Sequence, residues 1–379
     1  MIGGSAAGFY ASCLLAQAGR RVQVFEQNES LEPATRTLIV TRRMRELLGP
    51  LGEPAVLNEI RRFEIWSDGR SAQVSLRHPD LIIERAKLIR TLADQARSAG
   101  AEVILGKRFV GLAPDGARPM LEVERGGEGA REGIPVSVVI GADGALSRVA
   151  RAAGWPSQKT APLLQAVVRL PAEYPRDTVR VWFVPEDTPY FYWLIPETGD
   201  QGVLGLIGED GGATKRSLER FLERRGFEPL NYQGARIPLY TGWVPVYRRI
   251  GDAHVYLVGD AASQVKVTTV GGIVTGLRGA RAVARSILTG DGSGELRSLR
   301  RELDLHLLVR RSLHRFSQRE YSQVLDLLNP PAYRSLANFH RDEAARVLWR
   351  LCHNQPHLLW MGLRGLLTSR GFPSNGRKG

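Results

Sequence analysis

Short apolar runs alternate with helical patterns along the first part of the chain, and the alternation returns further on. Ala11–Ala18 has the composition of a small-residue helix, and Arg21–Glu26 alternates apolar and polar residues as a strand does. Leu88–Ala99 has the apolar spacing of an amphipathic helix and ends at a glycine. Val136–Gly141 and Val255–Val258 are apolar runs typical of buried strands. This order predicts an α/β fold with a Rossmann-type parallel sheet.

A glycine-rich turn, from Gly3 to Gly8, stands directly before the first helical pattern. Glu26 ends the following strand, about 20 residues further on, where a dinucleotide-binding fold places the acid that holds a ribose diol. Ser5 replaces the middle glycine of this fingerprint, so the backbone approaches a pyrophosphate less freely there. Only two residues precede the turn, whereas a strand has about five. We therefore expect a truncated first strand or a true start further upstream.

A second candidate site follows the last of the apolar runs. Gly259 and Asp260 end this run, and a Thr-Thr-Val-Gly-Gly turn then opens a helix at Ile273. A carboxylate at a strand end can hold a ribitol or ribose hydroxyl, and amides at a helix start can hold an anionic oxygen. Separately, a Gly-Asp pair is ordinary turn chemistry, and the first turn can be a helix–strand contact without a ligand. Together, and with Asp143-Gly144 between them, they predict a cofactor site.

These elements, in this order, resemble the FAD-dependent oxidoreductases that carry two Rossmann-type signatures. The resemblance implies that the Gly3–Gly8 turn and Glu26 bind the ADP part of FAD. It also implies that Asp143 closes the cofactor cleft, that Asp260 binds the ribitol, and that amides near Gly271 stabilise negative charge on the reduced flavin. The predicted cofactor-binding residues are Gly3, Ser5, Ala6, Ala7, Gly8, Glu26, Gln27, Arg36, Arg85, Asp143, Gly259, Asp260, Gly271, Gly272 and Ile273.

An aromatic segment bounded by prolines, residues 189–196, narrows the choice of family within this class. With the loop GDAASQVKVTTVGG, it is similar to the geranylgeranyl reductase family, whose members carry an aromatic-x-Trp-x-Phe-Pro segment and a GDAAG…TTGGG loop. The chain departs from these motifs at Ile195, Ile207 and Val270. The segment 33–43 also has no cysteine, whereas archaeal relatives place one near the flavin.

The resemblance, over about residues 1–290, implies an FAD-dependent oxidoreductase that reduces carbon–carbon double bonds of an isoprenoid or other hydrophobic substrate. NADPH, ferredoxin and free reduced flavin are the candidate external reductants. Phe191 and Trp193 would line the substrate cavity, with Tyr190 and Tyr192 as candidate proton donors, although aromatic residues are also ordinary strand formers. Two other functions stay open: a flavin monooxygenase or halogenase, and a non-redox lipid-binding or cyclase-like protein.

The composition indicates a globular protein with a large core, since 43% of its 379 residues are hydrophobic and 24% are charged. Its two cysteines, Cys13 and Cys352, give no disulfide framework, so we expect a reducing cytoplasm. The histidines lack metal-ligand spacing, because Pro356 interrupts any helix between His353 and His357. We therefore expect no metal site. No apolar run is long enough to span a bilayer.

The motif positions predict a discontinuous FAD-binding domain that is interrupted by a substrate domain and followed by a helical region. The alternating pattern of the inserted segments, as in Val179–Phe183, predicts a mostly antiparallel sheet. The predicted boundaries are 1–63, 80–160 and 250–295 for the FAD-binding domain, 64–79 and 161–249 for the substrate domain, and 296–379 for the C-terminal region.

The C-terminal region is basic and rich in leucine. From Arg297 to Gly379 it holds 15 Lys and Arg against 6 Asp and Glu, which accounts for most of the chain's net charge of +13. Residues 347–370 combine Trp, Leu and Arg as helices in an anionic membrane interface do. A helix packed on the FAD domain with a solvated basic face is the alternative. No nucleic-acid module is recognisable, so nucleic acid is not an expected partner, and the inner face of the membrane is a candidate location besides the cytoplasm.

Overall fold

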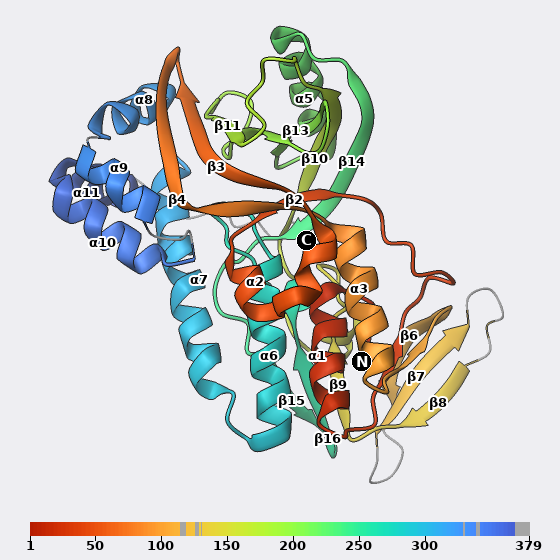
Figure 1. Cartoon of the computed structure of the whole chain (residues 1–379). Helices are drawn as coiled ribbons and strands as arrows, with labels where there is room; N and C mark the ends of the chain where they lie inside the picture. The colour runs from red at the N-terminus through yellow and green to blue at the C-terminus, as the bar shows by residue number, and fades with distance from the viewer. Residues whose placement is uncertain (114–118, 126–128, 130, 329, 339–341, 368–379) are drawn as a thin grey trace, which may run out of the picture. The chain divides into compact units, whose positions relative to one another are not determined.

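The computed structural model, drawn in Figure 1, describes residues 1–113, 119–125, 129, 131–328, 330–338 and 342–367. The chain divides into two compact units, each assembled from three separate segments. The first unit comprises Met1–Glu59, Asp80–Pro162 and Gln233–Leu303, and the second comprises Ile60–Pro79, Leu163–Tyr232 and Asp304–Gly379. The domain boundaries derived from the sequence stay a prediction.

The first unit is built on a sheet whose central strands are parallel. Ile2 forms bridges to Phe25 and to Gly141, so it joins the β1–β5 pair to the β9–β16 pair. The Ile2 N–H donates to the Ile140 carbonyl at 2.9 Å, and its carbonyl accepts the Ala142 N–H at 2.7 Å. The expected truncated first strand is thus a bridging residue. The strands are β1 (Gln23–Phe25), β5 (Glu102–Ile104), β9 (Val138–Gly141), β16 (Ala253–Leu257) and, antiparallel at the edge, β15 (Tyr247–Ile250).

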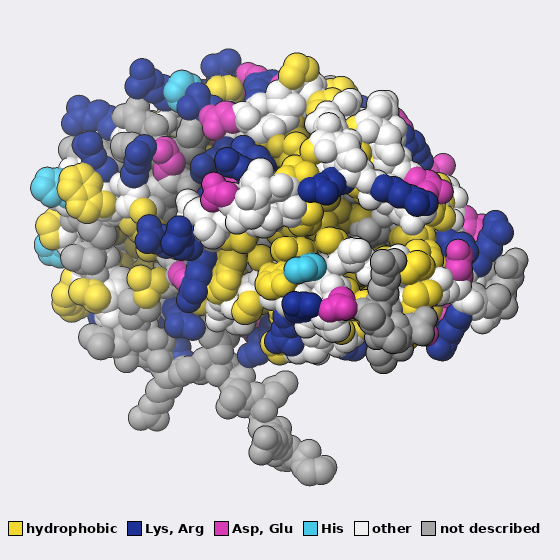
Figure 2. Space-filling model, turned by 90° about the horizontal axis from the view of Figure 1, so that it is seen from below, with side chains coloured by type: hydrophobic (Ala, Val, Ile, Leu, Met, Phe, Trp, Pro, Cys, Tyr) yellow, Lys and Arg dark blue, Asp and Glu magenta, His cyan; other side chains and the backbone are white. Residues whose placement is uncertain are grey.

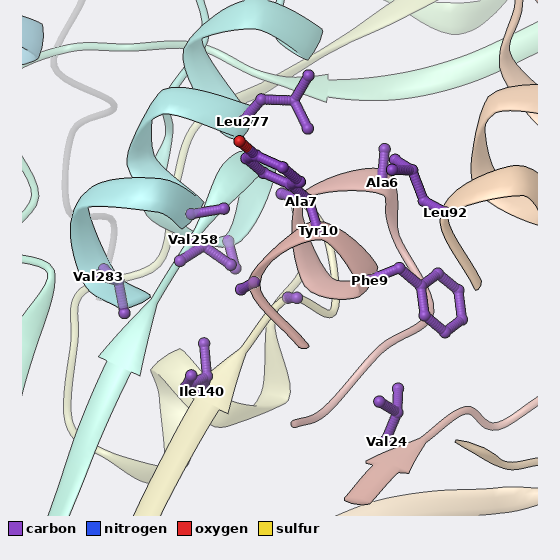
Figure 3. Packing of buried hydrophobic residues seen from close by; sticks show 14 of the residues in the cluster. Ala6, Ala7, Phe9, Tyr10, Val24, Leu92, Ile140, Val258, Leu277 and Val283 are labelled. Carbon is purple, nitrogen blue, oxygen red and sulfur yellow. The ribbon is translucent and has the colours of Figure 1, made fainter. Parts of the chain in front are cut away.

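Helix α1 (Ala6–Gln17) is the central helix of this unit because its small and apolar residues allow burial on nearly every side. It contacts α3 (Arg85–Ser98) on one side and α6 (Ile273–Thr289) on the other (Figure 1). In Figure 3, Tyr10 points toward Leu277 of α6, while Phe9 points away from it. Packing against two helices and the sheet fixes the start of α1 at the carboxyl ends of the parallel strands.

Shorter elements complete the first unit. Strand β2 pairs antiparallel with residues 81–84 at the end of β4 (Arg70–Glu84), and β6, β7 and β8 form a separate antiparallel sheet. The bounds are α2 (Arg43–Leu48), the 3-10 turns η1 (Gly49–Ala55) and η2 (Gly259–Ala262), α4 (Arg148–Ala152), β2 (Thr37–Val40), β6 (Lys107–Ala113), β7 (Met120–Arg125) and β8 (Arg131–Pro135).

The second unit carries a mostly antiparallel sheet covered on one face by α5 (Gly211–Arg225). Phe221 of α5 stacks on Tyr192 at 3.9 Å between ring centroids and meets Trp182 edge-on at 5.5 Å. The helix ends at Gly226, whose positive φ of 70° suits glycine. The strand order of this sheet is β14 (Pro229–Pro238), β10 (Thr160–Arg169), β13 (Gln201–Ile207), β12 (Tyr192–Pro196), β11 (Thr178–Trp182), β3 (Val56–Ser67), β4 (Arg70–Glu84) and, at the edge, β2.

The C-terminal part is helical, as predicted. The break expected at Pro356 is present, since one helix ends at Asn354 and the next begins at Pro356. Among the described residues, no helix combines the length and apolar character needed to cross a bilayer. The helices are α7 (Ser293–Leu313), α8 (Gln318–Leu327), α9 (Pro330–Asn338), α10 (Ala344–Asn354) and α11 (Pro356–Leu367).

The predicted fold class is confirmed: a Rossmann-type unit, an inserted and mostly antiparallel sheet, and a helical C-terminal region. On the face drawn in Figure 2, Lys and Arg side chains predominate over Asp and Glu, in keeping with the chain's net charge of +13. Those charges are spread over the face, so the figure alone identifies no binding patch.

Candidate functional site

The glycine-rich turn and the acid predicted to accompany it lie together. Ser5 caps α1, and its hydroxyl oxygen accepts a hydrogen bond from the Gly8 N–H at 3.2 Å. The Glu26 carboxylate accepts the Gly4 N–H at 2.7 Å, so the end of β1 is tied to the turn. The start of α1 has no acidic residue in its first turn, so its positive end is not neutralised within the helix.

The glycine-rich turn also packs closely against the residues that follow β9. Gly3 has a φ of 95°, and a Cβ there would stand 2.6 Å from the Ala142 carbonyl oxygen and 2.7 Å from the Asp143 Cα. Only glycine fits this crossing. The Asp143 carboxylate accepts hydrogen bonds from the start of α4, and burial raises its pKa against the effect of those bonds. The donors are the Ser147 hydroxyl at 2.6 Å, the Arg148 N–H at 2.7 Å and the Val149 N–H at 3.1 Å. Asp143 therefore fixes the turn beside Gly3.

Asp260 lies with two arginines that are distant in sequence. Burial raises the pKa of the Asp260 carboxyl, and the positive charges of Arg36 and Arg85 oppose that rise. Burial and the neighbouring Arg85 lower the pKa of Arg36 to about 10. The Arg85 N–H donates to the Arg36 carbonyl at 3.0 Å, which joins the segment before β2 to the start of α3. The structure thus brings together three predicted residues from three separate segments.

This region fits FAD. The Arg36 Nε atom is buried and has no hydrogen-bond partner in the described part of the chain, and an unsatisfied buried donor is costly. Arg36, Arg85 and Asp260 together carry a net positive charge, and a diphosphate would supply both acceptors and negative charge. The close crossing of Gly3 over the end of β9 holds the turn in the place that a dinucleotide-binding fold uses for the pyrophosphate.

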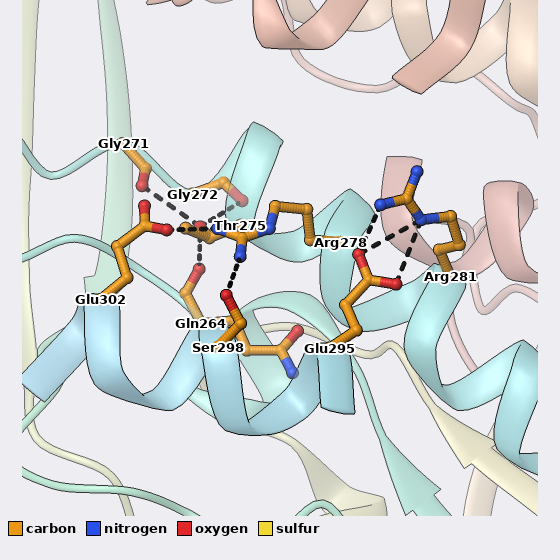
Figure 4. A network of polar contacts seen from close by, with 9 residues as sticks. All are labelled: Gln264, Gly271, Gly272, Thr275, Arg278, Arg281, Glu295, Ser298 and Glu302. Atoms are coloured by element: carbon orange, nitrogen blue, oxygen red, sulfur yellow. Dashed lines mark hydrogen bonds and ion pairs between the residues drawn. The ribbon is translucent and has the colours of Figure 1, made fainter. Parts of the chain in front are cut away.

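A polar network holds the loop before α6 (Figure 4). The Gln264 side-chain oxygen accepts the Gly259 N–H at 2.7 Å, and the Thr275 hydroxyl donates to the Gln264 carbonyl. Buried Arg278 of α6 pairs with Glu302 of α7. A second pair, between Arg281 and Glu295 at 2.6 Å, also joins α6 to α7. The sequence analysis did not predict this network, although Arg278 among the small apolar residues of α6 could have indicated a buried ion pair.

Val270, one of the departures from the family motif, has a φ of 53°. A β-branched residue is strained in this left-handed region, at a cost of about 1 to 2 kcal/mol. The next two residues are Gly271 and Gly272, and Gly272 precedes α6 without any side-chain cap. The loop therefore has a conformation that suits glycine at position 270.

We expect Val270→Gly to raise the free energy of unfolding by about 1 kcal/mol, because glycine relieves the strain at some cost in chain entropy. Thermal unfolding of the two proteins with FAD added at the same concentration measures the difference. Val274→Gly in α6 serves as the matched control and should destabilise, since it removes a buried side chain. A lower stability of Val270→Gly would contradict the strain argument.

The predicted substrate residues lie in the second unit, on both faces of its sheet. Phe191 and Trp193 meet edge-on at 6.0 Å between ring centroids. Side chains alternate along a strand, so Tyr192 projects to the other face, where its hydroxyl donates to Asp187 at 3.1 Å. Burial is the main cause that raises the pKa of Tyr192. Tyr190 lies under the Arg310 guanidinium, 3.8 Å from its ring centroid. The four aromatic residues therefore do not form one cluster.

All the predicted cofactor residues lie in the first unit. Gln27 is exposed beside Glu26, while Gly259 packs against Ala7, with 3.1 Å between the Ala7 Cβ and a Cβ built on the glycine. Within the described residues, no group of His, Cys, Asp and Glu is arranged to hold a metal ion.

Comparison with known proteins adds relatives of stated activity. Digeranylgeranylglycerophospholipid reductase 2 of Methanothermobacter thermautotrophicus is 31% identical over 200 residues, which are 51% of this chain and 51% of that protein. The chain thus spans about half the length of this relative in the match. A digeranylgeranylglycerophospholipid reductase of Methanothrix thermoacetophila is 27% identical over 400 residues, with 95% of this chain and 97% of the relative covered.

The fold is also that of a solved structure. A geranylgeranyl bacteriochlorophyll reductase-like protein from Thermoplasma acidophilum matches with a TM-score of 0.78 at 17% identity, covering 96% of this chain and 98% of the other. The family model described as FAD binding domain matches residues 1–296. That range includes every predicted cofactor residue. The chain belongs to the FAD binding domain family, and FAD is the cofactor of that family's domain.

Proposed function

We propose that this protein is an FAD-dependent oxidoreductase that reduces carbon–carbon double bonds of an isoprenoid lipid or a similar hydrophobic substrate. The observation that carries the proposal is the similarity to a digeranylgeranylglycerophospholipid reductase over 95% of this chain. That similarity extends beyond the cofactor unit and through the aromatic strand β12. Bound FAD would supply the hydride chemistry, and the protein would position cofactor and substrate.

In this proposal, the first unit holds FAD through backbone amides and fixed charges. The Gly3–Gly8 turn and the start of α1 bind the pyrophosphate, and Glu26 binds the adenosine ribose. Arg36 and Arg85 supply further positive charge, and the Arg36 Nε gains the partner that it lacks within the described chain. Asp260 accepts a hydrogen bond from the ribityl chain.

The remaining cofactor contacts in the proposal come from the start of α6. The N–H groups at Gly271, Gly272 and Ile273 lie at the positive end of this helix, where no side chain caps them. They are suited to hold the oxygen and nitrogen of the flavin ring that carry negative charge after reduction. Asp143 keeps its structural role beside the first turn.

In the second unit, we propose that Phe191 and Trp193 contact the hydrocarbon chain of the substrate. Trp193 is held in place because its Nε1–H donates to the Gln165 side-chain oxygen at 3.2 Å. Phe191 is partly exposed, so part of its ring can meet a ligand. Of the two tyrosines, Tyr190 is the better proton-donor candidate, since the single hydroxyl proton of Tyr192 already has two acceptors, the Asp187 carboxylate and the Ser217 carbonyl.

The test is an anaerobic reduction experiment. Protein loaded with FAD is reduced with dithionite, excess reductant is removed, and a geranylgeranyl glycerophospholipid is added while the flavin absorbance is recorded. We expect the flavin to reoxidise with the unsaturated lipid and to stay reduced with the saturated phytanyl lipid as control. Absence of reoxidation without oxygen, combined with lipid-dependent oxygen consumption in air, would replace the proposal with a monooxygenase.

We also propose that α10 and α11 contact an anionic membrane surface. Trp349 and Trp360 are 64% and 58% exposed, which is unusual for tryptophan. Each has an arginine over its ring, Arg350 at 5.6 Å and Arg364 at 5.7 Å from the ring centroid. Indole rings with adjacent cations are suited to the headgroup region of anionic lipids. Residues 368–370 of the predicted segment lie outside the described residues.

Replacing both Trp349 and Trp360 with alanine should weaken binding to anionic liposomes by on the order of tenfold at physiological salt, as the loss of about 1.4 kcal/mol of apolar burial implies. Cosedimentation with vesicles measures the affinity. Leu230→Ala, which removes an exposed apolar side chain from β14, is the control and should bind as the unaltered protein does. An unaltered protein that ignores anionic vesicles would refute the membrane proposal and leave the reductase proposal intact.

A further inference from the structure

The turn that carries Asp260 ends at a residue in the left-handed region of the backbone. Ser263 has a φ of 52°, and its N–H donates to the Asp260 carbonyl at 3.1 Å. A residue other than glycine persists in this region only where its surroundings compensate for the strain. Ser263 is buried, and its hydroxyl donates to the Gln158 side-chain oxygen at 2.7 Å. The strained end of the turn is therefore held from another segment of the chain.

Gln158 binds this turn at two points. While its side-chain oxygen accepts the Ser263 hydroxyl, its Nε2 group donates to the Ala261 carbonyl. Both ends of one side-chain amide are thus used within three consecutive residues of the turn. Because Ala261 follows Asp260 directly, the backbone of Asp260 cannot rotate without displacing an acceptor of Gln158.

The segment that carries Gln158 is itself fixed on both sides, between α4 and β10. Before it, the Trp155 Nε1–H donates to the Pro245 carbonyl at 2.7 Å. After it, the Lys159 carbonyl accepts the Leu239 N–H at 2.8 Å. These three segments all belong to the first unit. Gln158 therefore projects from an anchored backbone and can hold the Asp260 turn in place.

We propose that Gln158 is a positioning residue for FAD, which acts with Ser263 to fix the backbone at Asp260 so that this carboxylate meets the ribityl chain. Neutral hydrogen bonds add little net stability each, so their main effect here is on geometry. A binding group that is displaced slightly loses much of its contribution, and supporting hydrogen bonds prevent that displacement. The inference rests on the proposed FAD site.

The test is the affinity of the full-length protein for FAD, measured by fluorescence titration. Gln158→Leu removes both hydrogen bonds and should weaken binding about tenfold. Ser263→Ala keeps the strained φ without the hydroxyl and should weaken binding about fivefold. Ser263→Gly relieves the strain and should stay within about twofold of the unaltered protein. Gln73→Leu, at an exposed position of β4, is the matched control and should bind FAD as before.

A double variant distinguishes positioning from a purely structural role. If Gln158 acts through Asp260, then Gln158→Leu should cause no further loss of FAD affinity in the Asp260→Ala protein. Its effect on the thermal unfolding of the FAD-free protein should be the same in both backgrounds. Losses of affinity that add up in the double variant would refute the positioning role.

The outcomes also separate this inference from the proposed function. If Asp260→Ala binds FAD as the unaltered protein does, the proposed cofactor site is wrong at this point. If Asp260→Ala weakens binding and Gln158→Leu does not, the site stands and the role of Gln158 is refuted. Should Gln158→Leu fail to fold, Gln158→Glu takes its place, since a carboxylate can accept the Ser263 hydroxyl but cannot donate to the Ala261 carbonyl. Unchanged affinity in Gln158→Glu would refute the role.

Discussion

Replacing Gly3 with alanine is expected to weaken FAD binding at least about 100-fold and to lower the free energy of unfolding by about 3 kcal/mol. The added Cβ would stand 2.6 Å from the Ala142 carbonyl oxygen, and backbone atoms cannot rotate away as a side chain can. The φ of 95° at Gly3 adds strain for any residue with a Cβ. The turn would then separate from β9, and the amides that face the pyrophosphate would lose their positions.

A matched variant separates the effect of backbone strain at a positive φ from the effect of the steric clash. Gly19 also has a positive φ, 76°, but a Cβ there would meet no atom within 4 Å. Gly19→Ala should therefore destabilise by about 1 kcal/mol and bind FAD as before. Fluorescence titration with FAD and thermal unfolding measure the two effects. Equal affinity for FAD in Gly3→Ala and in the unaltered protein would show that the turn does not approach the cofactor.

Replacing Asp260 with alanine is expected to weaken FAD binding about 10- to 100-fold. The loss corresponds to one hydrogen bond to a charged group, worth about 1.5 to 3 kcal/mol. Arg36 and Arg85 would also lose the carboxylate that they act on. Asp252→Ala is the control, because Asp252 is exposed and pairs with Arg249 at 2.8 Å in the turn before β16. Titration with FAD at pH 7.5, about 3.6 units above an ordinary aspartate pKa, should distinguish the two variants.

The pH dependence of the affinity for FAD provides a second test of the role of Asp260. Burial raises the pKa of this carboxyl, so it takes up a proton at a higher pH than an ordinary aspartate. The affinity of the unaltered protein for FAD should therefore fall as the pH is lowered through that raised pKa. Asp260→Asn should bind weakly at every pH and lack this fall. Wild-type affinity in Asp260→Ala would remove Asp260 from the cofactor site.

Local rules were enough to predict how the residues of the first turn lie relative to one another. Gly3, Ser5 and Glu26 follow from a spacing that is set by one strand, one turn and one helix, so the structure brings them together as the pattern requires. Val270 shows that the backbone conformation of a loop could not be predicted from its sequence. Its departure from the family motif was visible in the sequence, but only the φ of 53° shows that the loop still has the conformation that favours glycine.

Contacts between distant elements were not predictable from pattern. The Arg278–Glu302 pair depends on how α6 packs against α7, and the contact between Gln264 and Gly259 depends on the fold of an irregular loop. The two tyrosine candidates show the same limit. Strand alternation separates Tyr192 from Trp193. Only the three-dimensional structure shows that the Tyr192 hydroxyl is hydrogen-bonded to Asp187 and to the carbonyl of Ser217 in α5.

The central claim is that reduced FAD on this protein adds hydrogen to an isoprenoid double bond. The most direct measurement is the mass of a geranylgeranyl glycerophospholipid after anaerobic incubation with the FAD-loaded protein and excess dithionite. We predict a gain of two hydrogen atoms for each double bond reduced, which is absent when FAD is omitted. An unchanged mass with protein that demonstrably holds reduced FAD, or the gain of an oxygen atom when air is admitted, would contradict this account.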